Sequence, residues 1–340
     1  MYFRELGLTG LKVVPIGFGG IPIQRLEQAA VTAIINQMMD EGLNFIDTAR
    51  GYTTSEQMIG VALEGGKRKN FIIASKSMSR DYEHMKADIE TSLKLLKTDY
   101  IDLYQCHLVK DLDQYAAIMS EDGAYKALLE AKAAGKIGHI GITAHSAEFI
   151  KQIIHEMPFE TLQFPYNLVE RQGESVFEVA NKRGIGVIVM KPIAGGAITN
   201  GALSLKYIMH NPHVSVAIPG MDQVSQVIEN AKVLKHETTF THEEQLEMDE
   251  IIKSLGESFC RRCGYCLPCP QGIDIPTQFL MEGYLTRYNL AEWALMRYDG
   301  LAVKADACVE CGECEPKCPY NLPIRKMHKN VVTQFDKIKK

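Results

Sequence analysis

Eight short apolar runs, separated by segments with helical periodicity, constrain the fold of this chain more than any other feature. Most runs are continuously apolar, which is typical of strands buried on both faces. Between them, apolar residues recur every three or four positions, as at Met85, Ile89, Leu93 and Leu96. The runs are Val13–Gly20, Asn44–Asp47, Phe71–Lys76, Ile101–His107, Ile137–Thr143, Leu162–Tyr166, Ile185–Lys191 and Val214–Pro219. Eight strands alternating with helices predict an α/β fold with a (β/α)8 TIM barrel, and an open doubly wound sheet is the structural alternative.

Cysteine marks the clearest domain boundary, because eight of the nine cysteines follow residue 259. We therefore expect the barrel over residues 1–236 and a cysteine-rich domain over residues 257–340. Residues 237–256 predict a connecting helix that is capped near Thr241. The cysteine-rich domain is expected to be mainly α-helical, with helices over Ile275–Tyr284 and Ala291–Tyr298.

Charge and hydropathy exclude several classes of protein. The net charge is −5, and no basic stripe indicates a partner nucleic acid. No apolar run approaches the roughly 18 residues that span a membrane. The first ten residues lack the apolar core of a signal peptide and instead suggest a small hairpin that turns at 8–10. A cytoplasmic location is the default expectation.

Four ionisable residues stand at or just beyond the carboxyl ends of three consecutive expected strands. Asp47 ends one strand and Tyr52 follows it in the loop, while Lys76 and His107 end the next two. The carboxyl ends of barrel strands converge on one mouth, so these four side chains are expected to meet. Taken singly, Asp47 is equally consistent with a helix N-cap, Tyr52 with a rim aromatic and His107 with a core histidine.

Together the four residues predict acid–base chemistry on a carbonyl group. A free tyrosine has a pKa of about 10, and a lysine cation held close to it favours the phenolate. Asp47 would hold Lys76 in place, and His107 would hydrogen-bond the carbonyl oxygen. Tyr52 would then donate a proton to that oxygen, with a nicotinamide as the usual source of hydride.

Two loops that follow the seventh and eighth expected strands suggest a nucleotide site. One reads Lys191-Pro192-Ile193-Ala194-Gly195-Gly196 and the other begins Pro219-Gly220. These loops are the usual phosphate-binding region of a barrel, where glycines let backbone N–H groups approach a pyrophosphate. Glycines required only for turns are the alternative.

The residues described so far resemble the aldo-keto reductase family over roughly residues 3–235. The resemblance is carried by Phe45–Tyr52 with Ser55-Glu56, Ile73–Lys76, Tyr100–His107, Gly138–Thr143, Gln163–Arg171, Pro192–Gly196, Ile218–Gly220 and Glu229-Asn230. It implies a (β/α)8 barrel, a catalytic tetrad of Asp47, Tyr52, Lys76 and His107, and NAD(P)H as cofactor. It also implies that Gln163 binds the carboxamide and that Glu229 and Asn230 lie at the adenine.

Several positions depart from the family pattern. Met190 stands where many members stack a tyrosine on the nicotinamide, and Ala144-His145 replaces a serine–asparagine pair. Many members hold the 2′-phosphate with lysine, serine and arginine, where this chain has Gly220, Met221 and Gln226. The preference between NADPH and NADH is therefore left open.

The cysteines form two runs, and each run ends in proline. The first is Cys260-x2-Cys263-x2-Cys266-x2-Cys269-Pro270, and the second is Cys308-x2-Cys311-x2-Cys314-x3-Cys318-Pro319. The second run has the spacing of bacterial ferredoxins that bind [4Fe–4S] clusters. Structural zinc, the alternative, usually uses two separated cysteine pairs.

Two [4Fe–4S] clusters are therefore expected in the C-terminal domain. In two-cluster ferredoxins the fourth cysteine of a run binds the other cluster. This rule assigns Cys260, Cys263, Cys266 and Cys318 to one cluster. It assigns Cys269, Cys308, Cys311 and Cys314 to the other. The module resembles an α-helical two-cluster ferredoxin, and both runs resemble the ferredoxin-bearing branch of aldo-keto reductases.

Two functions follow from the sequence. The first is an NAD(P)H-dependent oxidoreductase that reduces a small-molecule carbonyl substrate, with clusters for electron transfer or structure. The alternative is an iron–sulfur electron-transfer or redox-sensing protein whose barrel is a docking module. A ferredoxin or another electron carrier is a candidate partner. A nicotinamide transfers two electrons at once and a cluster accepts one, so the role of the clusters in turnover is open.

Overall fold

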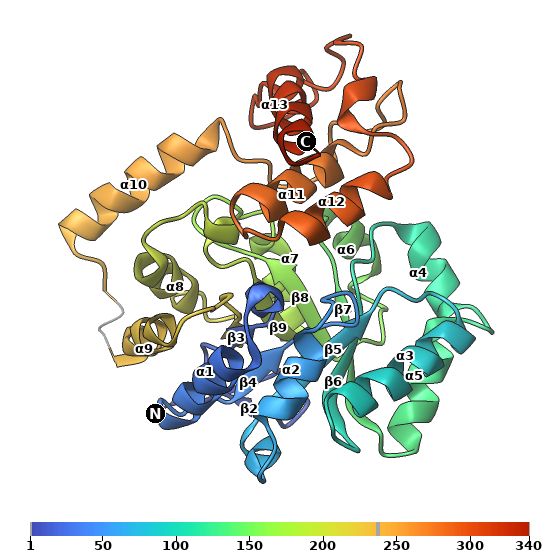
Figure 1. The fold of residues 1–340 in the computed structure, drawn as a ribbon, viewed down its shortest axis with the longest axis vertical. Helices are drawn as coiled ribbons and strands as arrows, with labels where there is room; N and C mark the ends of the chain where they lie inside the picture. Colours follow the sequence, from blue (N-terminus) through green and yellow to red (C-terminus); the bar gives the residue numbers. More distant parts are fainter. Residues whose placement is uncertain (1, 236–238, 340) are drawn as a thin grey trace. The chain divides into compact units, whose positions relative to one another are not determined.

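The eight apolar runs form a closed parallel barrel in the computed structural model, which describes residues 2–235 and 239–339 (Figure 1). The sheet order runs without exception from β3 to β10, each strand parallel to its neighbours. Parallel bridges from Ile16 to Ala217 and from Gly19 to Gly220 join the two ends. The strands are β3 (Phe18–Gly19), β4 (Phe45–Asp47), β5 (Ile72–Ser77), β6 (Ile101–Cys106), β7 (Ile137–Thr143), β8 (Thr161–Pro165), β9 (Gly186–Met190) and β10 (Val216–Ala217). Closure confirms the barrel and rules out the open sheet.

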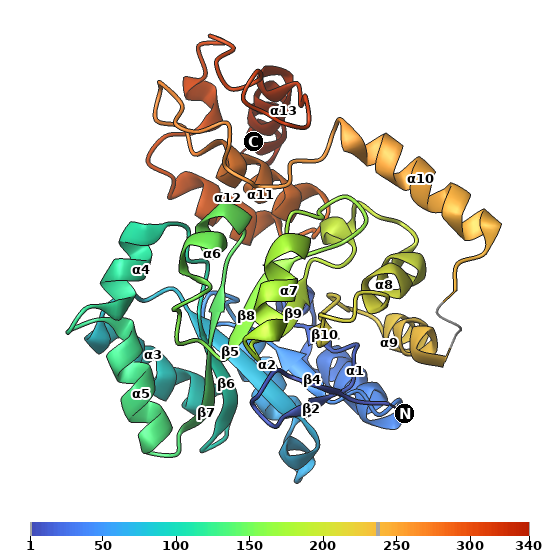
Figure 2. The same cartoon turned by 180° about the vertical axis from the view of Figure 1, so that it is seen from behind.

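Nine helices of the described residues follow the strands and surround the barrel, as Figure 2 shows from behind. They bury apolar faces at helical spacing, for example Met85, Ile89 and Leu93 on α3. The helices are α1 (Gln28–Asp40), α2 (Ser55–Ala62), α3 (Tyr82–Leu95), α4 (Leu112–Met119), α5 (Ala124–Ala133), α6 (Ala147–Ile153), α7 (Glu174–Lys182), α8 (Gly201–Met209) and α9 (Val224–Lys232).

A hairpin precedes the barrel, as the sequence predicts. Strand β1 (Arg4–Glu5) pairs antiparallel with β2 (Lys12–Val13). Leu6, between them, is fully buried in a cluster with Phe45 and Leu103 of the barrel interior. The expected strand Val13–Gly20 was wrong in extent, because Val13 belongs to the hairpin and only Phe18–Gly19 belongs to the barrel. Pro15 lies between the two and has no N–H to donate to a ladder.

The described chain divides into two compact units. The first comprises 2–167, 171–193 and 200–239, and the second comprises 168–170, 194–199 and 240–339, each within its described residues. Helix α10 (His242–Gly256) begins at a capping box in which Thr241 accepts from Glu244 N and Glu244 accepts from Thr241 N. The expected boundary between residues 236 and 237 lies outside the described residues.

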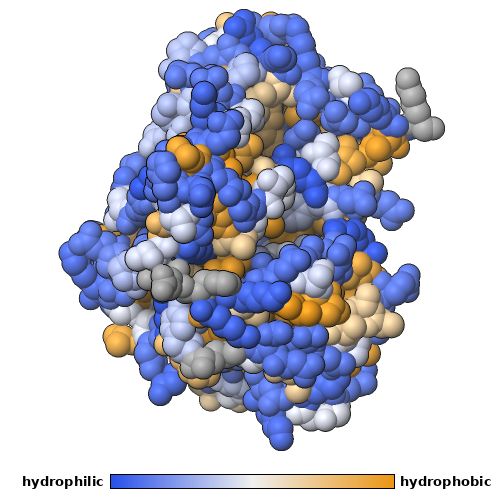
Figure 3. All heavy atoms as spheres, turned by 90° about the vertical axis from the view of Figure 1, so that its left-hand side faces the viewer, coloured by the Kyte–Doolittle hydropathy of each residue, from blue (hydrophilic) through white to orange (hydrophobic). Residues whose placement is uncertain are grey.

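The second unit contains three further helices and long irregular loops that carry the cysteines. The helices are α11 (Ile275–Thr286), α12 (Ala291–Asp299) and α13 (Ile324–Ile338). The positions of α11 and α12 agree with the two helices expected between the cysteine runs. Leu246 and Ile252 of α10 are exposed, and Figure 3 shows a face on which hydrophobic side chains form separate groups among hydrophilic ones. No described helix is both long enough and apolar enough to cross a membrane.

Candidate active site and cysteine cavities

The four expected catalytic residues meet at the carboxyl ends of β4, β5 and β6. Lys76 Nζ donates a hydrogen bond of 2.6 Å to Asp47 Oδ2 and another of 2.7 Å to the carbonyl oxygen of Thr48. The same nitrogen lies 5.0 Å from the centre of the Tyr52 ring. The ring of His107 meets the ring of Tyr52 edge-on, with centroids 5.8 Å apart. Convergence of parallel strand ends therefore brings all four side chains together.

Because both side chains are buried, Lys76 and Asp47 depend on each other to stay charged. Lys76 is 0% exposed, Asp47 is 2% exposed and Tyr52 is 6% exposed. Burial raises the pKa of Asp47, and Lys76 opposes that shift. Burial also lowers the pKa of Lys76, and the charge of Asp47 opposes it. Each group thus depends on the other to keep its charge.

A second carboxylate supports this pair, and the sequence reasoning assigned it no role. Glu56, in the first turn of α2, is 1% exposed. It accepts 2.6 Å hydrogen bonds from Ser75 Oγ and from Arg50 Nη1. Its charge favours the charged form of Lys76. The available signal was a glutamate at the start of a short helix whose other buried residues are small or apolar.

Two glutamines extend the polar interior of the barrel. Gln105 Nε2 donates to Gln163 Oε1 at 2.8 Å, and both residues are buried. Gln163 also hydrogen-bonds Asp47 and favours its ionised form. Gln105 was missed, although it precedes His107 by two positions and so shares the same face of its strand.

The loop after β9 carries the expected nucleotide-binding residues. Lys191 Nζ lies 3.0 Å from His145 Nε2, in the loop after β7. The carbonyl oxygen of Pro192 accepts a hydrogen bond of 2.5 Å from Ser204 Oγ. Gly195 has a φ of 64° and falls in the second unit, whereas Lys191 and Pro192 fall in the first.

The loop after β10 is close-packed rather than open. A Cβ added to Gly220 would lie 2.7 Å from Pro22 Cγ, so only glycine fits there. Gln226 Oε1 accepts from the backbone N–H groups of Asp222 and Gln223 and so caps α9. The carboxylate of Asp222 pairs with Arg25.

The expected adenine-side residues lie on α9. Glu229 is exposed and Asn230 is partly buried. None of the contacts described above joins either residue to the tetrad.

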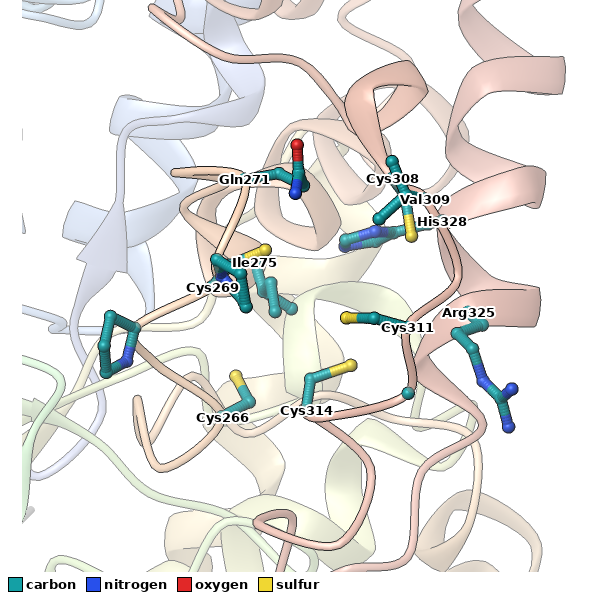
Figure 4. Close-up of a pocket in the computed structure, with 13 residues that line it drawn as sticks. Cys266, Cys269, Gln271, Ile275, Cys308, Val309, Cys311, Cys314, Arg325 and His328 are labelled. Carbon is teal, nitrogen blue, oxygen red and sulfur yellow. The ribbon is translucent and has the colours of Figure 1, made fainter.

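The eight C-terminal cysteines surround two cavities in the second unit. One cavity is lined by Cys260, Cys263, Cys266 and Cys318. The other is lined by Cys269, Cys308, Cys311 and Cys314 (Figure 4). Cys266 also reaches the second cavity. Within residues 2–235 and 239–339, no three His, Cys, Asp or Glu side chains are placed to hold a single metal ion.

Two consecutive arginines fix the loop that carries the first cysteines. Arg262 forms a buried ion pair with Glu170. Arg261 donates to the carbonyl oxygen of Val169 at 3.0 Å, and its guanidinium lies 3.9 Å from the centre of the Tyr320 ring. The backbone N–H of Arg262 points at Cys260 Sγ at 3.4 Å. These contacts hold the cysteine loop in a defined shape.

A parallel barrel with an ionisable cluster at its mouth stands in one chain with two cysteine-lined cavities, the combination that the sequence predicts for an oxidoreductase. A model of the aldo/keto reductase family matches residues 15–202. A model of a 4Fe-4S dicluster domain matches residues 259–323. The chain therefore belongs to the aldo/keto reductase family and carries a C-terminal 4Fe-4S dicluster domain.

Individual relatives agree with this assignment. The chain is 29% identical to L-galactose dehydrogenase of Arabidopsis thaliana over 300 residues, which cover 73% of this chain and 90% of that protein. It is 31% identical to the aldo-keto reductase YhdN of Bacillus subtilis, over 61% of this chain and 66% of that protein. The aldo-keto reductase AKR11C1 of Bacillus halodurans, in its holo form, shares the fold with a TM-score of 0.63 and 24% identity, over 74% of this chain and 96% of that one.

Proposed function

We propose that this enzyme reduces a carbonyl compound at the barrel mouth, with Tyr52 as the proton donor. The observation that carries the proposal is the buried ammonium of Lys76, which lies 2.6 Å from Asp47 Oδ2 and 5.0 Å from the centre of the Tyr52 ring. A cation at this position stabilises the negative charge that remains on the phenol oxygen when its proton leaves. The arrangement therefore suits a tyrosine that acts as a general acid.

The other members of the tetrad position and support Tyr52. Asp47 and the Thr48 carbonyl oxygen accept hydrogen bonds from Lys76 and so aim its ammonium. His107 lies edge-on to Tyr52 and donates to the same substrate oxygen, which orients the carbonyl group for protonation. Since Tyr52 is nearly buried, its proton passes to the substrate with little competition from water.

The barrel residues that would bind NAD(P)H are Gln163, Lys191, Pro192, Gly220, Glu229 and Asn230. The support for this site is Lys191, whose Nζ lies 3.0 Å from His145 Nε2 in the loops that follow β9 and β7. Lys191 adds a positive charge that attracts a phosphate-bearing ligand. When bound, the nicotinamide supplies hydride to the carbonyl carbon.

The loop after β10 favours NADH over NADPH. Gln226, at the position where many family members bind the 2′-phosphate with arginine, is committed to the N-terminus of α9. Asp222 lies in the same loop, and its ion pair with Arg25 leaves that cation less available to a 2′-phosphate.

Two [4Fe–4S] clusters would occupy the cysteine cavities of a ferredoxin-type domain, which we assign to residues 257–340, after the barrel and helix α10. One cluster would be held by Cys260, Cys263, Cys266 and Cys318. The other would be held by Cys269, Cys308, Cys311 and Cys314. The grouping of these cysteines around two cavities, with Cys266 at both, supports this assignment. When bound, the clusters carry single electrons or brace the loops. A ferredoxin or similar carrier is then the macromolecular partner.

One experiment separates the enzyme from a pure electron-transfer protein. Protein purified without oxygen is assayed for iron and sulfide, and then for oxidation of NADH and NADPH with a panel of aldehydes and ketones. We expect about eight iron atoms per chain and carbonyl-dependent oxidation of NADH. Clusters that a reduced ferredoxin reduces, with no carbonyl consuming either nucleotide, would favour the electron-transfer protein instead.

A further inference from the structure

His328 occupies a core position beside one cysteine cavity. It lies on α13, whose buried row is Ile324, His328, Val331 and Phe335. Its side chain is the one polar group in that row. The residue is 2% exposed, and its ring lies against Phe279 with centroids 5.2 Å apart. If this position served only to pack α13, an aliphatic residue would be sufficient there.

The cavity that His328 lines is the one bounded by Cys269, Cys308, Cys311 and Cys314. Figure 4 shows the imidazole beside Cys308 and Cys311, directed into the space that the sulfurs surround. Among the described residues, neither ring nitrogen of His328 has a hydrogen-bond partner. Buried polar atoms in folded proteins nearly always have one, so this ring is built for a partner that belongs in the cavity.

The ring is suited to donation of a hydrogen bond, because an imidazole carries at least one N–H in either protonation state. The nearby cation Arg325 is already paired with Glu315 through two hydrogen bonds, of 3.0 and 2.6 Å. Gln271, which also lines the cavity, is exposed to solvent, whereas His328 is buried.

The two cavities differ in this respect. The cavity of Cys260, Cys263, Cys266 and Cys318 has no histidine among its described lining residues. Its polar lining side chains are Tyr320 and Arg261, and Arg261 donates to the backbone carbonyl oxygens of Val169, Gly256 and Phe259. Hydrogen bonds to cluster sulfurs raise the reduction potential, because they stabilise the more negative reduced state. A hydrogen bond from His328 would thus act on one cluster and not on the other.

We propose that His328 donates its ring N–H to a sulfur of the cluster held by Cys269, Cys308, Cys311 and Cys314, and so raises the reduction potential of that cluster alone. This inference rests on the two clusters assigned above. It makes this cluster easier to reduce than it would be without the donor. His328 is a positioning residue, since no substrate atom touches it.

Redox titrations followed by electron paramagnetic resonance test the proposal on the full chain, purified without oxygen. His328→Leu removes the donor and His328→Gln keeps an N–H. Val331→Ala is the packing control, because Val331 lies in the same buried row of α13 and lines neither cavity. A Cys311→Ala chain, which retains only the other cluster, assigns the two signals. At a fixed potential we expect His328→Leu to lower the reduced-to-oxidised ratio of one cluster about tenfold, which is 59 mV for a one-electron couple.

The remaining results also decide the question. We expect a smaller shift in His328→Gln, none in Val331→Ala, and an unchanged potential of the other cluster in all three variants. Equal shifts in His328→Leu and Val331→Ala, or no shift at all, would show that His328 does not donate to the cluster. Loss of half the iron in both His328 variants would make His328 a ligand instead and would also overturn the proposal. Absence of clusters from the parent protein would defeat the cluster assignment itself, which the iron count reveals first.

Discussion

Replacement of Lys76 by methionine tests the buried pair at the barrel mouth. The change removes the ammonium but keeps much of the side-chain length. Lys76 and Asp47 are 0% and 2% exposed and 2.6 Å apart, so the variant leaves a carboxylate buried without its counter-ion. Breaking such a pair costs about 3–5 kcal/mol of the free energy of unfolding. Loss of a preorganised charge at a reacting oxygen lowers kcat by about 10²–10³-fold.

A double variant separates stability from catalysis. Asp47→Asn combined with Lys76→Met removes both charges, so we expect most of the lost stability to return while activity stays low. Urea unfolding followed by circular dichroism measures the first quantity, and carbonyl-dependent oxidation of NADH measures the second. Recovery of activity in the double variant would show that catalysis does not need the Lys76 charge. If Lys76→Met unfolds at the same urea concentration as the parent protein, the buried pair does not contribute the expected stability.

Three further predictions concern pH, a surface network and the cysteines. Burial lowers the pKa of Lys76 from its ordinary value of 10.5, so its charge is lost at a lower pH than that of a free lysine. We therefore expect kcat for reduction to fall as the pH rises, and a flat profile would contradict this. Partial burial acts to raise the pKa of Glu160, but hydrogen bonds from His139, Lys132 and the Ile140 N–H hold it at about 2. This stabilisation is present above the unfolded pKa of 4.5 and lost as pH falls through 2. Glu160→Gln should therefore lower the free energy of unfolding by about 1–2 kcal/mol at neutral pH, after discount for exposure, and by nothing at the acid end. Cys311→Ala should halve the iron content, whereas Cys106→Ala, which changes the buried barrel cysteine, should leave the iron unchanged.

Strand periodicity and the chemistry of strand ends were sufficient to predict the barrel and the meeting of its four mouth residues. Parallel strands force their carboxyl ends together, so Asp47, Lys76 and His107 needed no long-range information beyond strand order. The first expected strand failed in extent because its apolar run continues through Pro15, and hydropathy alone does not register a missing N–H donor.

Other features depend on contacts between segments far apart in the chain. Lys191 meets His145 across 46 positions, and Gln226 is committed to a helix cap that its residue type alone does not reveal. His328 looks like an ordinary core residue until α13 is placed against the cysteine loops. Spacing within a cysteine run cannot show which residues of a distant helix face the sulfurs.

Hydride transfer in a single turnover of Tyr52→Phe tests the central claim most directly. The variant removes one oxygen atom and keeps the ring that packs against Lys76 and His107. With NADH bound and a reducible carbonyl in excess, we expect binding of the nucleotide to survive and its oxidation to slow by about 10²–10⁴-fold. Oxidation at the parent rate would show that the proton reaches the carbonyl oxygen from another group.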